Sequence, residues 1–232
     1  MGNLESDAHF VGFKIEESLA NKLTHFVESV AQQQKSAGQA YVDFVEDLTK
    51  HITSSLLIEM VEVAEISKVG QKVVNVCVSS SNKVSGMLTA KIYKKRSVKE
   101  LQPVAELWKS RLQKASEENG GGHYLIAPID GDFGAALEAI ISEKGDEAHF
   151  VPNELDNVMS QYDRLSKAII DLYFLEATRL VEMGSITKTM LSTGVGTVEK
   201  AVESVFNKVI RPLEPKKFAS FVDHINQFHV RA

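Results

Sequence analysis

The spacing of apolar residues near both ends of the chain constrains the fold more than any other feature of the sequence. Over residues 13–35, and again over residues 41–66, apolar side chains recur every three or four positions. That spacing gives an α-helix one apolar face. The polar segment 34–38 separates the two stretches, so we predict two long helices joined as an antiparallel hairpin.

The last third of the chain follows the same rule. Residues 155–172 carry apolar side chains in steps of three and four and predict another long helix. The small residues 192–197 predict a break in helical structure. Further helices are expected over about 198–209 and 218–228. Helices from both ends of the chain could then pack together as one bundle.

The middle of the chain favours a small sheet. Residues 73–78 and about 86–93 are rich in Val, Ile and Thr and flank a polar, turn-like segment, which is typical of strands. Residues 124–127 and 148–151 predict two shorter strands. We therefore expect a helix-rich α+β fold, in which long terminal helices form a bundle and a sheet of three or four strands lies mid-chain.

Two more helices are expected beside these strands. One covers about 97–118, with Pro103 at or near its first turn, and the other follows the segment Asp130–Gly134. The predicted organisation has three parts: an N-terminal helical hairpin (1–69), a small α/β subdomain (70–152) and C-terminal helices (153–232) that pack on the first part.

Composition is that of a globular protein, with 232 residues, 44% of them hydrophobic and 25% charged. No stretch reaches the ~20 apolar residues that cross a bilayer, and we identify no secretory signal. The single cysteine, Cys77, lies in an apolar run and is expected to be buried and inert. These features predict a soluble, cytoplasmic protein without a membrane span.

Positive charge gathers in residues 83–114, which hold nine Lys or Arg residues and two Glu residues, although the whole chain has a net charge of −5. A basic segment can bind an anionic ligand or nucleic acid. The alternative is internal: acidic residues of the helix at 41–66 could lie beside it. The anion-binding candidates are Lys91, Lys94, Lys95, Arg96 and Arg111.

A second candidate is a polar site. Asp130 and Asp132 follow a predicted strand and precede a helix, a common position for active sites, and His123 lies just before the same strand. The alternative is structural, with Asp132 capping the helix and Gly131 and Gly134 making the turn.

No catalytic or metal-binding motif identifies the function. None of the seven histidines has the Glu-x-x-His spacing of a di-iron bundle, and we expect no metal and no cofactor. The favoured hypothesis is a non-enzymatic interaction or assembly protein that self-associates as a homo-oligomer through amphipathic helices or binds a protein partner. The alternatives are the anion-binding module on 83–114 and an enzyme with a site near Asp130–Gly134.

Overall fold

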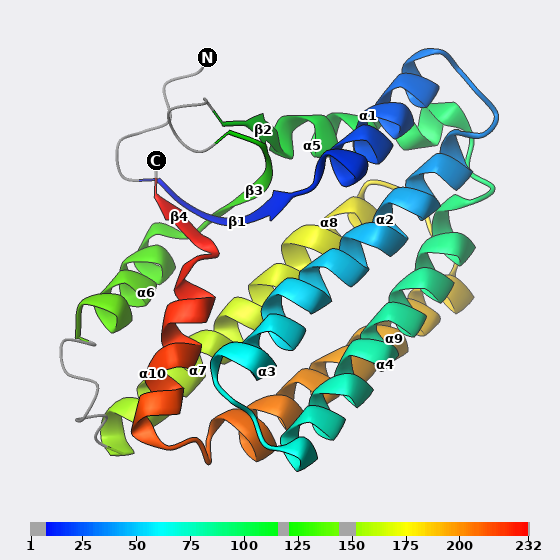
Figure 1. Cartoon of the computed structure of the whole chain (residues 1–232). Helices are drawn as coiled ribbons and strands as arrows, with labels where there is room; N and C mark the ends of the chain where they lie inside the picture. The colour runs from blue at the N-terminus through cyan, green and yellow to red at the C-terminus, as the bar shows by residue number, and fades with distance from the viewer. Residues whose placement is uncertain (1–7, 116–120, 144–151, 232) are drawn as a thin grey trace.

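Long helices lie side by side through most of the molecule, and a small antiparallel sheet lies next to them (Figure 1). The computed structural model describes residues 8–115, 121–143 and 152–231. The α+β fold class predicted from the sequence is confirmed.

The N-terminal part contains one strand that the sequence pattern did not predict. β1 (His9–Ile15) precedes α1 (Glu17–Ala31), whereas we predicted that helix from residue 13. The long helix predicted at 41–66 is confirmed as a continuous helical run. It consists of α2 (Ala37–Thr53), the π-helical segment η1 (Ser54–Ile58) and α3 (Glu59–Val63).

The two strands predicted at 73–78 and 86–93 are wrong, because both segments belong to one helix, α4 (Lys68–Tyr93). Its buried residues recur at helical spacing: Val74, Cys77, Ser81, Leu88 and Ile92. That face packs between α2 and α9, so tertiary burial outweighs the β preference of the valines. Cys77 is buried, as predicted.

The next segment alternates helix and strand. α5 (Val98–Arg111) contains Pro103 in its interior and ends seven residues before the predicted limit of 118. β2 (Leu112–Lys114) follows it directly. The side chain of Ser97 and that of Glu100 form a capping box that fixes its start. β3 (His123–Ile129) confirms the strand predicted at 124–127, and α6 (Gly131–Glu143) follows it. The strand predicted at 148–151 lies outside the described residues.

The C-terminal part is helical up to its last strand. Its elements are α7 (Pro152–Ile170), η3 (Asp171–Leu175), α8 (Glu176–Arg179), α9 (Ser185–Val205), η4 (Phe206–Ile210), α10 (Pro215–Asn226) and β4 (His229–Arg231). The break predicted at 192–197 is wrong, because α9 runs through it. A Cβ atom on Gly194 would lie 2.7 Å from a Leu88 methyl carbon, so this glycine lets α9 approach α4 closely.

The four strands have the order β2-β3-β1-β4, and every neighbouring pair is antiparallel. A sheet of this size was predicted, but β1 and β4 come from the two ends of the chain and only β2 and β3 from its middle. The division at residues 69 and 152 stays a prediction.

One core joins the sheet to the helices. The hydroxyl oxygen of Tyr173, in η3, lies 2.8 Å from the carbonyl oxygen of Val11 and 2.9 Å from that of Leu125. Its ring packs edge-on against Phe13. Neighbouring strands are therefore held by the same helical side chain. In the described part of the chain, no helix has the length and hydropathy needed to cross a membrane.

Candidate functional site

An apolar cavity of about 150 Å³ lies inside the helical bundle. α2, α4, α7 and α9 form its walls, and residues of η1, α3, η3, α8, η4 and α10 complete the lining. The wall residues are mostly aliphatic or aromatic, for example Val45, Leu88, Leu165, Ile169, Val198 and Phe221. Such an apolar space between packed helices is a usual place for a small-molecule site.

The cavity exists because α9 packs closely on one side only. Gly194 brings α9 against Val84 and Leu88 of α4, whereas α9 makes few contacts with α7. The apolar side chains Val198 and Val202 are half-buried and point into the space that this packing leaves. These valines are too short to fill it.

The polar groups in the wall are hydroxyls of Ser, Thr and Tyr, and several of them have hydrogen-bond partners within the protein. Thr49 donates a hydrogen bond to the carbonyl oxygen of Val45 and lies 2.8 Å from the hydroxyl of Ser85. The hydroxyls of Tyr93 and Tyr162 differ, because both are buried and have no hydrogen-bond partner among the described residues. Burial raises the pKa of Tyr162, and the nearby carboxylate of Asp223 raises it further. The wall therefore contains two neutral hydroxyls, those of Tyr93 and Tyr162, that can bond to a ligand.

An empty cavity of this size destabilises a protein. The side chains that line the space lose van der Waals contacts that an occupant would supply. Apolar cavities of this volume can take up small hydrocarbons. A ligand with the right shape would restore many of those contacts.

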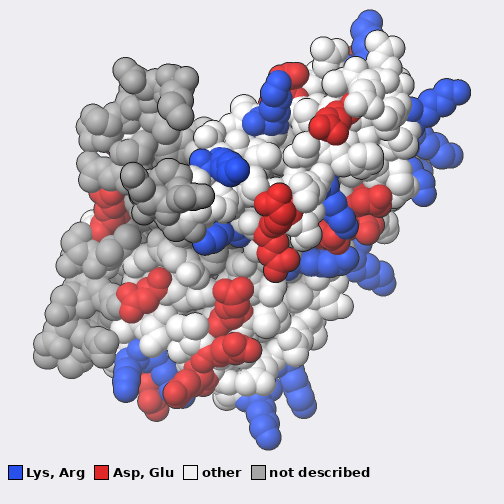
Figure 2. All heavy atoms as spheres, turned by 45° about the horizontal axis from the view of Figure 1, so that its top comes forward, with Lys and Arg blue, Asp and Glu red and all other residues white. Residues whose placement is uncertain are grey.

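The five predicted anion-binding residues do not form one group. Arg111 is buried, and its guanidinium bonds to the Glu176 carboxylate at 2.5 Å and to the carbonyl oxygen of Leu172. Arg96 bonds to Glu100 and to the backbone. Lys91, Lys94 and Lys95 are exposed near the end of α4. Figure 2 shows positive and negative side chains mixed over the face that it draws, and not one basic patch.

The predicted polar site is also divided. His123 begins β3 and lies 3.1 Å from a carboxylate oxygen of Glu17, whereas Asp130 follows the other end of the strand. At about 3.3 Å per residue, the strand separates the two by roughly 20 Å. Asp130 accepts a hydrogen bond from the backbone nitrogen of Phe133, so the helix is capped by Asp130 and not by Asp132, which is exposed.

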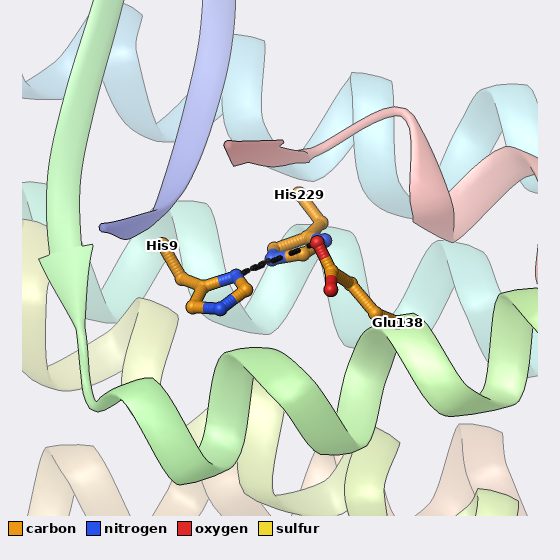
Figure 3. Close-up of side chains that lie close together, drawn as sticks. All are labelled: His9, Glu138 and His229. Atoms are coloured by element: carbon orange, nitrogen blue, oxygen red, sulfur yellow. Dashed lines mark hydrogen bonds and ion pairs between the residues drawn. The ribbon is translucent and has the colours of Figure 1, made fainter. Parts of the chain in front are cut away.

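The structure brings together three residues that the sequence analysis did not group. The side chains of His9, Glu138 and His229 converge from β1, α6 and β4 (Figure 3). His9 and His229 are 220 positions apart, so no local spacing could reveal them. Two imidazoles and a carboxylate are a ligand set for transition metals.

No protein-family model, curated protein or solved structure matches this chain. Its function therefore has to be argued from its own residues.

Proposed function

We propose that this protein binds a neutral, unbranched apolar molecule in the cavity of the helical bundle. The observation that carries the proposal is the 150 Å³ apolar space between α2, α4, α7 and α9. The lining extends along the helices, from Tyr41 in α2 to Met60 in α3, which favours an elongated occupant over a compact one.

The wall chemistry favours a ligand without charge. A carboxylate in this apolar surrounding would lose its hydration without gaining a cationic partner. The buried Tyr162 hydroxyl can donate a hydrogen bond to one oxygen of the ligand, and Asp223 near it would repel an anion. A fatty alcohol has both the hydrocarbon chain and the neutral oxygen.

A series of 1-alkanols from hexanol to dodecanol tests this proposal by calorimetric titration. Each added methylene should tighten binding about fourfold, as expected for ~0.8 kcal/mol per buried CH₂, until the cavity is full. Octanoate should bind more weakly than octanol. Affinity that is independent of chain length, or no binding at all, would contradict the proposal.

Two variants locate the binding. Val198→Phe puts a ring into the cavity and should abolish alkanol binding, whereas Thr193→Phe, at an exposed position of the same helix, should leave it unchanged. Tyr162→Phe should weaken binding of octanol by about 1 kcal/mol and reduce the preference for an oxygen-bearing chain. If Val198→Phe binds octanol as the parent does, the ligand lies elsewhere.

Self-association is a second candidate function, favoured by an exposed apolar stripe on α4. Val69, Val76 and Met87 are 74%, 65% and 52% exposed, and at 100° per residue they point in nearly the same direction. Exposed apolar residues that share one helix face are typical of interaction surfaces. Light scattering at low and high salt tests this function: a stable multiple of 25.6 kDa that Val76→Lys reduces to a monomer would support it.

The other hypotheses remain predictions. Anion binding now depends on Lys91, Lys94 and Lys95, because Arg96 and Arg111 have internal partners. An enzymatic site near Asp130–Gly134 and a cytoplasmic location are untested.

A further inference from the structure

We infer that His9, Glu138 and His229 form a binding site for a divalent transition-metal ion of the zinc type. This inference is independent of the bundle cavity, because none of the three residues lines it.

The sheet register places the two histidines on one face. β1 and β4 are antiparallel, with Val11 opposite His229 and His9 opposite Arg231. His9 and His229 are therefore diagonal neighbours, with side chains on the same side of the sheet. Figure 3 shows both imidazoles pointing toward α6, from which Glu138 reaches up to them.

A glycine in α6 makes this approach possible. A Cβ atom on Gly134 would lie 2.0 Å from Cγ of His9, so the helix backbone rests directly on the imidazole ring. Glu138 is one helical turn beyond Gly134 and on the same face of α6. The contact at Gly134 therefore positions the carboxylate beside the histidines.

The distances suit a small ion. Nδ1 of His9 is 3.0 Å from Nε2 of His229 and 3.8 Å from Oε1 of Glu138, and all ligand atoms of the three residues lie within 4.8 Å of one another. For metal bonds of 2.0–2.1 Å, tetrahedral ligands are about 3.4 Å apart. These two distances each differ from that value by about 0.4 Å, and the ligand atoms of His229 and Glu138 lie within 4.8 Å of each other.

The two imidazoles can exchange the hydrogen bond between them for bonds to a metal ion, and neither ring has to lose a proton. Between the facing nitrogens, one ring donates and the other accepts. When an ion binds, the donating ring carries its proton on its other nitrogen and offers a lone pair instead. Both states use neutral histidines.

Burial gives the site one closed and one open side. His9 is 7% exposed, whereas the Glu138 side chain is 34% exposed. Water can reach an ion from the side of Glu138 and fill the fourth position, as in zinc sites with three protein ligands. Two imidazole ligands select zinc-type ions over Mg²⁺ and Ca²⁺, which prefer oxygen.

Titration with Zn²⁺, followed by calorimetry, tests the inference on the full chain. We expect one ion per chain, and binding that a large excess of Mg²⁺ does not displace. Glu138→Gln and His229→Gln should each weaken binding by about 100-fold or more, since even the loss of an outer partner costs 10–100-fold. Asp132→Asn on the same helix and His25→Gln on the exposed face of α1 are the matched controls and should bind as the parent does.

The unfolding temperature is a second measurement, which distinguishes a loss of metal binding from a loss of the fold. Bound Zn²⁺ should raise the unfolding temperature of the parent and of both controls, and EDTA should reverse the rise. If His229→Gln fails to fold, Glu138→Gln still tests metal binding, because Glu138 is partly exposed and its replacement should leave the fold intact. Absence of stoichiometric binding, or binding that Glu138→Gln leaves unchanged, overturns the inference.

Discussion

Nε1 of Trp108 donates a 3.0 Å hydrogen bond to the hydroxyl oxygen of Tyr41, and both side chains are buried. The bond joins α5 to α2. Burial raises the pKa of Tyr41, so its hydroxyl stays neutral and available to the indole.

Tyr41→Phe should lower the free energy of unfolding by about 1–3 kcal/mol, because it leaves the Trp108 N–H buried without an acceptor. Urea denaturation measures this change. Tyr124→Phe, which removes a hydroxyl from a half-buried side chain of β3, is the control and should change stability by less than about 0.5 kcal/mol. Equal effects of the two variants would contradict the role of the Trp108 bond.

Arg111→Met should cost about 3 kcal/mol, because the buried guanidinium stabilises both the Glu176 carboxylate and a backbone carbonyl. Its cation also lies 5.4 Å from the ring centre of Trp108. Lys109→Met, at an exposed position of the same helix, should be nearly neutral. Adding Glu176→Gln to Arg111→Met should recover part of the loss in a double-mutant cycle, and strict additivity would exclude the coupling.

Gly134→Ala should destabilise the protein by about 1–3 kcal/mol, because the new methyl group would overlap the His9 ring. This loss exceeds the gain in helix propensity of up to about 1 kcal/mol. Gly131→Ala is the matched control on the same helix, since nothing lies within 4 Å of its Cβ position. The midpoint of thermal unfolding should be lower than that of the parent for Gly134→Ala and unchanged for Gly131→Ala.

Stability should fall as the pH drops from about 7 to 5.5, partly because of His224. Nε2 of this buried residue donates to the carbonyl oxygen of Ser55, and Nδ1 accepts from Gln227 at 3.0 Å. Burial lowers the pKa of His224, so below pH ~6.5 the unfolded chain takes up the proton more readily than the folded one.

His224→Gln should keep a donor for Ser55 and flatten this pH dependence. Urea midpoints at pH 7 and 5.5 measure the difference between parent and variant. An equal fall in both proteins would assign the pH dependence to other groups.

The sequence predicted most helices correctly because their apolar faces are continuous, but it failed where tertiary contacts decide. β1 carried no alternation to recognise: all its residues except Lys14 are buried, so Phe13 fitted the helical series that follows. In α4, β-branched residues suggested strands, and only packing on α2 and α9 explains the helix. Gly194 suggested a break, although its role is close contact with Leu88.

The candidate sites could not be predicted from local patterns. Three widely separated elements bring His9, Glu138 and His229 together, and the cavity depends on how α9 stacks on α4. Charge in the sequence suggested Arg96 and Arg111 as anion-binding residues. It could not show that their partners, Glu100 and Glu176, lie within the same molecule.

The pairing of β1 with β4 determines when the protein can finish folding. Ribosomes make the residues around His9 220 positions before those around His229, so β1 lacks this partner while the chain between them is made. An unpaired strand edge can pair with a neighbouring chain. Growing chains on one messenger RNA therefore expose this strand edge until β4 is made and pairs with it, and this interval is when chaperones have most to protect.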